Sequence, residues 1–487
     1  MALEFIDNIS KYIPSIKAPQ RPLALREKMF WTALIIGVYF VLYNINAYGV
    51  SAAPVSSELQ LLSIIFAAKI GSIITVGIGP IVLSSILLQL LTGSGLIKID
   101  MNNLQEKSRF QAIQKILSIS IAVVEAVAYT LSGFVPITST SFALIVIIQL
   151  AIGAIAIIFM DEMMSKYGIT SGINMFIASG VSYAIVAGTV EILFPEAIST
   201  IAAGGAAAIS NTVLVFAPLF FSVLILLISI YAFETKVELP LTFEQLRGVG
   251  GRLPIPFLYV SVLPVILASA LELSLTVWFR FLANVHGTFA NLVNFFALYQ
   301  PVGTAGGGTT LQLTGGLIYL ISPTFPLPYP APLGIGGYGP YFSFLATQTS
   351  NLILPWGGIL LIPEWIHAII YVGVLVLLCV IFGKFWIEMT GQSPKNVAEQ
   401  LGDMGWQIPG FRRDPRIIEG LLNKYIPVVT VLGSVFVGLL AALATLTGAI
   451  STGMGILLTV GIIYMVYQQL EQERLYETYP ILEKIAK

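Results

Sequence analysis

The sequence predicts an all-α protein that crosses a membrane many times. Of its 487 residues, 56% are hydrophobic and only 10% are charged, whereas soluble domains carry about 25% charged residues. Long apolar stretches recur along the chain, and basic residues gather in alternate connections between them. One soluble core cannot bury so much apolar surface, so lipid must cover part of it.

Ten stretches are apolar and long enough to cross a bilayer, which takes about 20 residues. Between Lys28 and Glu58, and again from Val127 to Met160, the sequence has no charged residue. The predicted spans cover residues 29–49, 71–92, 110–132, 141–160, 172–193, 211–233, 257–280, 366–388, 426–447 and 452–470.

Basic residues predict the orientation of these spans, because cytoplasmic loops retain Lys and Arg. Of the 24 basic residues, all but Lys69 and Arg280 lie in or beside the N-terminal segment, every second loop or the C-terminal tail. The pattern predicts that both termini are cytoplasmic. The first residues include Glu4 and Asp7 and lack the apolar core of a signal peptide. Residues 2–13 predict a short helix that ends at Pro14 and lies either on the membrane surface or against a partner helix.

The Gly- and Ala-rich stretch 196–210 divides the ten spans into five and five. An odd number of spans per half forces the second half to enter the membrane upside down, which predicts two inverted five-helix halves. The predicted first half covers 29–195 and the second 211–470, with cytoplasmic loops 234–256 and 389–425. Residues 1–28 and 471–487 form the cytoplasmic N-terminal segment and tail.

Two further segments do not fit simple spans. Residues 54–68 are too short to cross the bilayer and form either an external surface helix or a re-entrant helix in a cavity, because protein or a cavity must cover irregular chain at membrane depth. Residues 285–365 are rich in Gly, Pro, Tyr and Phe. They predict an external insertion that lies outside the bilayer or dips partly into it.

No predicted span carries the residues of an enzyme. The sequence has no phosphate-binding Gly loop and no HExxH motif, and its single cysteine, Cys379, excludes an intramolecular disulfide. Its two histidines, His286 and His367, are far apart. We therefore expect no catalytic residue, no metal site and no cofactor.

Charged residues well inside the predicted spans are few. A charge at the bilayer centre costs about 3 kcal/mol, so Glu125 in the third span is either a functional polar site or a protonated group bonded to a neighbour. Glu272 and Arg280, near the end of the seventh span, are expected at the membrane interface.

Three functions fit a bundle of this kind. A passive channel needs an aliphatic constriction, whereas an ion-coupled secondary transporter with inverted repeats needs several ionisable groups at the midplane. Glu125 is one such group, whereas the transporter needs several, so the sequence supports the transporter only weakly. A membrane scaffold without transport is the third and weaker alternative.

Short motifs spread over nearly the whole chain resemble the SecY family, the α-subunit of protein translocons, and its archaeal branch in particular. Each motif is weak alone, but their order across ten spans is specific. The matching stretches are residues 71–80, 161–168, 171–173, 247–252, 257–260, 264–267, 410–413 and 457–460.

The resemblance implies an hourglass pore between the two halves, closed at its waist by a ring of aliphatic side chains. A narrow apolar constriction blocks ions by dewetting, yet flexible side chains can part around a polypeptide. Residues 54–68 would be the plug that fills the external funnel. The residues implied for the ring are Ile78, Val82, Ile173, Ile177, Ile266 and Leu458.

The resemblance also implies a lateral gate, where spans two and three face spans seven and eight. Apolar substrate segments would leave through it into lipid. Glu125 keeps one polar position of the gate, but Val262 and Leu83 stand where the family often carries Asn and Thr. We therefore expect a gate that is more apolar than usual.

The partners implied by the resemblance begin with the ribosome, which docks on the two large cytoplasmic loops. These loops contain four arginines that suit contacts with RNA phosphates: Arg247, Arg252, Arg412 and Arg413. The alternative is that these arginines reflect only the ordinary enrichment of basic residues in cytoplasmic loops. The other implied partners are single-span subunits of the SecE and SecG/Secβ kind, signal-sequence-bearing nascent chains and membrane lipid, with no DNA. The expected location is the cell (plasma) membrane.

Overall fold

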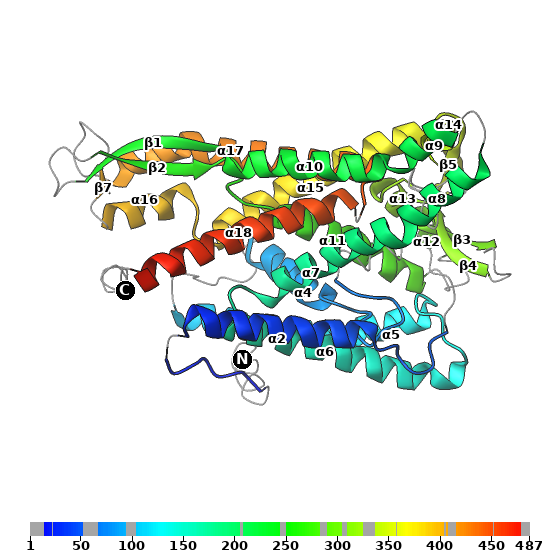
Figure 1. The fold of residues 1–487 in the computed structure, drawn as a ribbon, viewed down its shortest axis with the longest axis horizontal. Coiled ribbons are helices and arrows are strands. Elements are labelled where there is room, and N and C mark those ends of the chain that lie inside the picture. The colour runs from blue at the N-terminus through cyan, green and yellow to red at the C-terminus, as the bar shows by residue number, and fades with distance from the viewer. Residues whose placement is uncertain are drawn as a thin grey trace.

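The computed structural model describes most of the chain and is dominated by long helices. These helices run along the long axis of the molecule, and a small β-sheet lies at each end (Figure 1). The described residues are 14–21, 23–51, 67–93, 104–204, 208–243, 250–282, 290–303, 309–324, 337–356, 358–403, 406–407, 415–450 and 452–478.

Each of the ten predicted spans overlaps a helix. Among the described residues, seven helices are long and apolar enough to cross a membrane, and two shorter ones are also apolar. The predicted class of a mostly helical membrane protein is thus confirmed. The span helices of the first half are α2 (Leu25–Asn44), α4 (Gly79–Gly93), α5 (Leu104–Leu131), α6 (Ala143–Tyr167) after the short η1 (Thr140–Phe142), and α7 (Gly172–Ala187), which continues through the π-helix η2 (Gly188–Leu193) into α8 (Phe194–Ala203).

The second half begins with α9 (Ala208–Val215), which leads into α10 (Ala217–Glu234). Its remaining long helices are α11 (Leu263–Leu282), α15 (Glu364–Met389), α17 (Pro415–Leu446) and α18 (Thr452–Thr478), and the short α16 (Pro394–Asp403) lies between α15 and α17. Helices α4 and α5 pack against α11, and α7 packs against α18, so the two halves share one apolar core.

The second predicted span is helical only from Gly79, not from residue 71. Gly71 and Gly77 adopt positive φ angles of 89° and 60° before the helix. The Thr75 hydroxyl accepts from the Gly71 N–H at 3.0 Å and donates to the Ser72 carbonyl at 2.6 Å, so local bonds satisfy this irregular backbone. Helix α6 covers it closely, because a β-carbon on Gly153 would lie 2.0 Å from the Ile73 carbonyl oxygen. Protein contact therefore makes the non-helical chain tolerable at this depth.

The two predicted cytoplasmic loops meet in one three-stranded sheet. Strands β1 (Lys236–Phe243) and β2 (Gly250–Pro256) form an antiparallel hairpin, and β7 (Trp406–Gln407) pairs with the other edge of β1. This sheet extends from the same end of the bundle as the C-terminal end of α18 (Figure 1).

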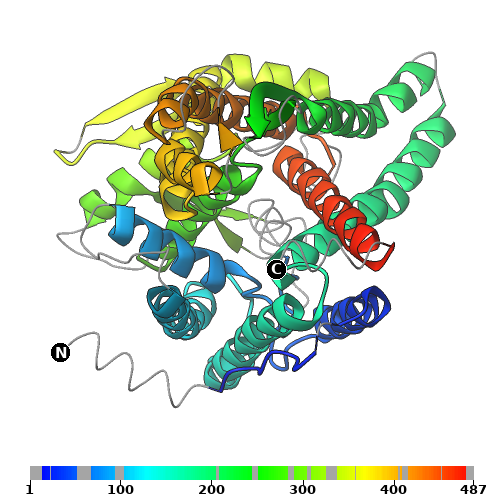
Figure 2. The ribbon, with the colours of Figure 1, turned by 90° about the vertical axis from the view of Figure 1, so that its left-hand side faces the viewer.

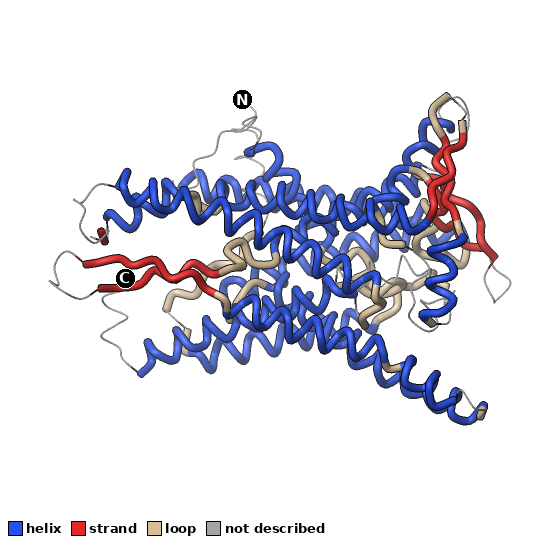
Figure 3. Tube along the Cα trace, turned by 90° about the horizontal axis from the view of Figure 1, so that it is seen from above, coloured by secondary structure: helices blue, strands red, loops and turns tan. Residues whose placement is uncertain are grey.

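The predicted insertion 285–365 forms the other end of the molecule and contains strands that the sequence analysis did not predict. Its sheet has the order β3-β4-β5-β6, in which only β4 and β5 are parallel. Figure 3 shows these strands running across the direction of the long helices. The elements are α12 (Ala290–Phe296), β3 (Leu298–Gly303), β4 (Thr309–Gly315), α13 (Leu317–Ile321), α14 (Tyr338–Thr347), β5 (Thr349–Ile353) and β6 (Ile359–Pro363).

A buried hydrogen-bonded cluster fastens this end of the molecule to α15. The Tyr319 hydroxyl donates to Glu364 Oε1 at 3.1 Å, and Glu364 Oε2 lies 2.8 Å from His367 Nδ1. His367 Nε2 donates to the Ser322 carbonyl at 3.0 Å, because a carbonyl oxygen can only accept. Helix α13 and the turn after it are thereby tied to the first turn of α15.

Candidate functional site

The six side chains predicted for the pore ring come from α4, α7, α11 and α18. Two of them, Ile78 and Ile173, lie where a helix begins. The Ile78 carbonyl accepts from the N–H groups of Ile81 at 3.0 Å and Val82 at 3.2 Å, so Ile78 opens α4. The Ile173 N–H donates to Asp161 Oδ1 at 2.9 Å, which ties the start of α7 to α6. Local hydrogen bonding thus fixes the backbone of both positions.

All six residues lie inside the bundle. Ile78, Val82, Ile177, Ile266 and Leu458 are buried in the main core, and the half-buried Ile173 packs against it. Helix α11 contacts both α4 and α18, so the four helices form a connected group. None of the six faces the outer surface, but their placement around one central axis stays a prediction.

Most of the predicted plug, residues 54–66, lies outside the described residues. Its last two residues, Ala67 and Ala68, are buried. The Tyr39 hydroxyl of α2 donates to the Ala67 carbonyl at 2.8 Å, and a β-carbon on Gly180 of α7 would lie 3.5 Å from Ala67 Cα. The described end of this segment therefore lies between two helices and not on an external surface.

Two of the predicted gate residues lie on adjacent helices of the first half. Glu125 on α5 is 1% exposed, and its Oε2 atom has no hydrogen-bond partner among the described residues. Leu83 is buried on α4. A bond between the Ser84 and Ser118 hydroxyls, 2.6 Å apart, joins these two helices. The gate would thus hold an unpaired carboxyl oxygen on α5, one of two helices that buried serine hydroxyls join.

Val262, the third predicted gate residue, lies in the turn before α11. Its two γ-carbons are 3.1 and 3.2 Å from the position that a β-carbon on Gly461 would occupy. Phe233 of α10 is 2.7 Å from the same position. Val262 and Phe233 thus both pack against Gly461 of α18, and no described contact joins Val262 to Glu125.

A buried polar face on α11 was not predicted from the sequence. Protein covers both Glu272 and Arg280, and their expected depth at the membrane interface stays a prediction. Glu272 Oε1 and Ser274 Oγ have no hydrogen-bond partner in the described part of the chain. The signal was present in the sequence, because Ser269, Glu272, Thr276 and Arg280 recur at helical spacing.

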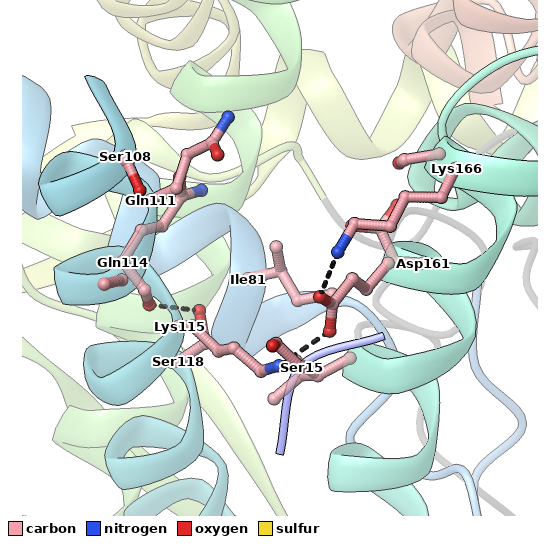
Figure 4. Close-up of a pocket in the computed structure, with 13 residues that line it drawn as sticks. Ser15, Ile81, Ser108, Gln111, Gln114, Lys115, Ser118, Asp161 and Lys166 are labelled. Atoms are coloured by element: carbon pink, nitrogen blue, oxygen red, sulfur yellow. Dashed lines mark hydrogen bonds and ion pairs between the residues drawn. The ribbon is translucent and has the colours of Figure 1, made fainter. Parts of the chain in front are cut away.

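A polar pocket of about 500 Å³ opens between α5 and α6, beside the start of α4 (Figure 4). Glu162 is its centre, with one carboxylate oxygen 2.6 Å from Lys115 Nζ and the other 2.8 Å from Lys166 Nζ. The pocket lining includes Ile81, Gln114, Ser118 and Asp161. This pocket was not predictable from local sequence patterns, since its residues come from three helices and the N-terminal segment.

The N-terminal segment crosses this pocket as a strap. Lys115 Nζ donates to the Pro14 carbonyl at 2.7 Å, and the Ile16 N–H donates to Glu162 Oε1 at 3.1 Å. Lys166 Nζ donates to the Ile16 carbonyl. Two lysines face two carboxylates, so the pocket offers no excess charge to an ionic ligand. Among the described residues, no group of three or more His, Cys, Asp or Glu side chains could hold a metal ion.

Of the four arginines predicted to bind the ribosome, only Arg252 is described. Its side chain on β2 is 76% exposed and forms an ion pair with Glu238 of β1, with 2.6 Å between Nη1 and Oε2. Arg247, Arg412 and Arg413 lie outside the described residues. The pairing of β1 with β7 nevertheless brings the two loops that carry all four arginines into one sheet.

Comparisons with known proteins agree with this architecture. The SecY family model matches residues 72–467. The chain is 36% identical to the protein translocase subunit SecY of Methanocaldococcus jannaschii and 35% identical to that of Methanococcus vannielii. The alignments cover 98% of both chains in the first case and 99% of both in the second.

Solved structures show the same similarity. One described as "The structure of a protein conducting channel" superposes with a TM-score of 0.76 at 34% identity, covering 97% of this chain and 98% of the other. Another, "Sec61 in the Canine ribosome-channel complex from the endoplasmic reticulum", gives a TM-score of 0.74 at 34% identity with the same coverage.

These matches span nearly the full length of the chain and both of its halves. They decide between the channel and the secondary transporter that the residues alone left open. The chain therefore belongs to the SecY family of protein translocase subunits, multi-pass membrane proteins that act as protein-conducting channels and not as enzymes.

Proposed function

We propose that polypeptides cross this channel between its two halves, through a waist closed by the six aliphatic side chains of the pore ring, Ile78, Val82, Ile173, Ile177, Ile266 and Leu458. One observation carries this proposal: these aliphatic side chains, supplied by both halves, lie in the shared core of the bundle. An apolar constriction excludes water and ions when narrow. Branched side chains without hydrogen bonds can also move aside when a chain passes.

The plug is proposed to be the segment 54–68, which would cover the waist in the resting channel. The burial of Ala67 and Ala68 between α2 and α7 supports the re-entrant alternative over the external surface helix.

The lateral gate is proposed to open between α4 and α5 on one side and α11 and α15 on the other. These helices pack against each other. The unpaired Glu125 oxygen supports this seam as the place that opens, because a buried polar atom without a partner weakens local packing. Apolar segments of a nascent chain would leave here into lipid, driven by the favourable transfer of apolar surface.

The proposed partners are the ribosome, signal-sequence-bearing nascent chains and small subunits of the SecE and SecG/Secβ kind. The exposed β1-β2-β7 sheet, with the arginine-bearing loops beside it, is the proposed ribosome-docking surface. This proposal places both termini in the cytoplasm and the chain in the cell membrane, in agreement with the distribution of its basic residues. Since a passive channel does no work, the ribosome or another motor would push the polypeptide.

Ion leak through reconstituted protein tests the pore ring. Ile78, Ile173 and Ile266 are each changed to Ser, alone and together, and we expect the triple variant to conduct ions. Two matched variants serve as controls: Ile152→Ser at an exposed site on α6, and Ile157→Ser at a fully buried site on the same helix. A leak in Ile157→Ser equal to that of the ring variants would show general loosening and would defeat the assignment, as would an unchanged conductance of the triple variant.

A further inference from the structure

The hairpin formed by β5 and β6 is unusual in its sequence. From residue 352 to residue 363 the chain reads Leu-Ile-Leu-Pro-Trp-Gly-Gly-Ile-Leu-Leu-Ile-Pro, without a charged side chain and with the Trp356 N–H as its only polar side-chain group. The whole stretch 281–363 contains no Asp, Glu, Lys or Arg. A segment that stood free in water would be expected to carry charges on at least one face.

Strand β5 buries one face at Ser350 and Leu352, whereas the first three residues of β6 are exposed on both faces. Trp356 near the turn is 78% exposed, and Ile359, Leu360 and Leu361 of β6 are 65%, 51% and 60% exposed. Neighbouring residues of a strand point to opposite faces, so neither face of β6 is covered by the protein. Strand β6 is also an edge strand, because it pairs only with β5. A long apolar edge of this kind in water would be a site of aggregation.

The hairpin extends to the side of the helical bundle. Strands β5 and β6 run across the direction of the helices (Figure 3). Viewed along the bundle, the yellow hairpin extends sideways past the helices (Figure 2). In a multi-pass membrane protein the space beside the helices is occupied by lipid. Exposed apolar side chains occur again on α15, where Trp365 and Ile369 are 52% and 62% exposed.

The chemistry of the hairpin limits how deep it can lie. The outer edge of β6 presents backbone N–H and C=O groups without strand partners, and such groups do not occur exposed to the hydrocarbon region of a bilayer. The headgroup region supplies hydrogen bonds to these groups and is also where Trp side chains concentrate. Trp356 and Trp365 flank β6 on either side.

We propose that the β5–β6 hairpin lies in the headgroup region of the membrane leaflet at its end of the bundle, where it is a lipid-binding anchor. The lipid contacts are made by Trp356, Ile359, Leu360 and Leu361. This inference needs only that the protein crosses the membrane, and it is independent of the pore ring and the ribosome surface. Because β6 leads directly into α15 and the Glu364–His367 pair fixes that junction, the anchor sets the depth at which α15 begins.

A fluorescent label on the hairpin tests the proposal. The full-length protein with Ile359→Cys is labelled with NBD and reconstituted into vesicles of phosphatidylcholine and phosphatidylglycerol. The native Cys379 is fully buried, so it should take up little label. The unchanged protein is the control that measures this background labelling. The matched control is Thr347→Cys, an exposed position at the polar end of α14 in the same unit of the fold. Quenching is measured with aqueous iodide and with lipids that carry a nitroxide near the headgroup or near the bilayer centre.

The expected result is strong quenching of the label at position 359 by the shallow nitroxide, at least about two-fold stronger than at position 347, with weak quenching by iodide. Equal iodide quenching at both positions would place the hairpin in water and overturn the proposal. Stronger quenching by the deep nitroxide would contradict the headgroup location. A label reached by neither quencher would show that another protein or a second copy covers the hairpin, which would also overturn lipid as its partner.

Discussion

The two ends of this molecule carry small sheets of opposite chemical character. The hairpin β1–β2 has Lys236, Glu238 and Arg252 on its strands, and its Arg252–Glu238 ion pair is largely exposed. The sheet β3–β6 lies in a stretch without one charged side chain, and its β5–β6 hairpin exposes aliphatic and aromatic groups instead. Secondary structure alone therefore does not tell which solvent surrounds a hairpin. The charge content of its strands does, because a charge is cheap in water and costly in lipid.

The polar groups at the two ends also differ in how far solvent reaches them. At the charged end, Glu162 and its two lysines are partly open to solvent. At the uncharged end, Glu364 and His367 are almost completely buried, and every bond they make is internal. Breaking a bond should therefore cost more at the uncharged end, since water cannot replace the lost partner.

The largest effect is expected from His367→Leu. The change removes the histidine partner of Glu364 Oε2 and of the Ser322 carbonyl, although Tyr319 still donates to Glu364 Oε1. Removing one member of a buried pair costs about 3 to 5 kcal/mol. Unfolding in mixed micelles measures the loss. A loss below about 1 kcal/mol would mean that water reaches the cluster, and the contrast between the two ends would disappear.

A smaller loss is expected from Glu162→Gln at the charged end. The amide cannot accept from both lysines as a carboxylate does, and hydrogen bonds to charged groups are worth about 1.5 to 3 kcal/mol. The strap at residues 14–17 should also be cut faster by a protease, because the Ile16 N–H loses its charged acceptor. Unchanged proteolysis would show that the strap is held by its other contacts.

Leu361→Arg in β6 should have a still smaller effect on stability, but it should clearly change the depth of the hairpin in the membrane. A basic side chain near the membrane interface costs about 0 to 1 kcal/mol, but it should lift the NBD label at position 359 toward water and weaken its quenching by shallow nitroxide. Val237→Arg, a partly exposed site on β1, is the matched change in the charged hairpin. That variant should leave the label at position 359 unaffected. If both variants changed the quenching at position 359 equally, the assignment of the β5–β6 hairpin to lipid headgroups and of the β1–β2 hairpin to water would be contradicted.

The smallest change in stability is expected from Arg252→Gln, because an exposed ion pair contributes at most about 1 kcal/mol. Its effect should instead appear as weaker co-sedimentation with ribosomes and a smaller salt dependence. Arg21→Gln is a close control, since Arg21 is also 76% exposed and pairs with Glu27 at 2.7 Å. If both variants lose ribosome binding equally, the arginines supply only general positive charge.

Patterns in the local sequence predicted most of the helices. They failed where hydrogen bonds from side chains and contacts with another helix stabilise an irregular backbone. The second span begins at Gly79 because Thr75 and Gly153 satisfy and cover the preceding turns, and no periodicity in residues 71–78 reveals that. The strands of residues 298–363 escaped prediction for a similar reason. An apolar run broken by Gly and Pro fits a buried strand, a short helix or a membrane-dipping loop equally well.

The sequence by itself determined that the chain spans a membrane through apolar helices, and it separated a charged end from an uncharged one. Both properties follow from composition and spacing, which act residue by residue. The aliphatic residues that enter the shared core were identified only through the resemblance to the SecY family. Only the tertiary structure decided that Glu272 is buried, that Val262 faces Gly461, that the N-terminal strap closes over Glu162 and that the apolar hairpin points sideways past the helices. Each of these depends on which distant segments come into contact, and contact between distant segments is fixed by packing in three dimensions.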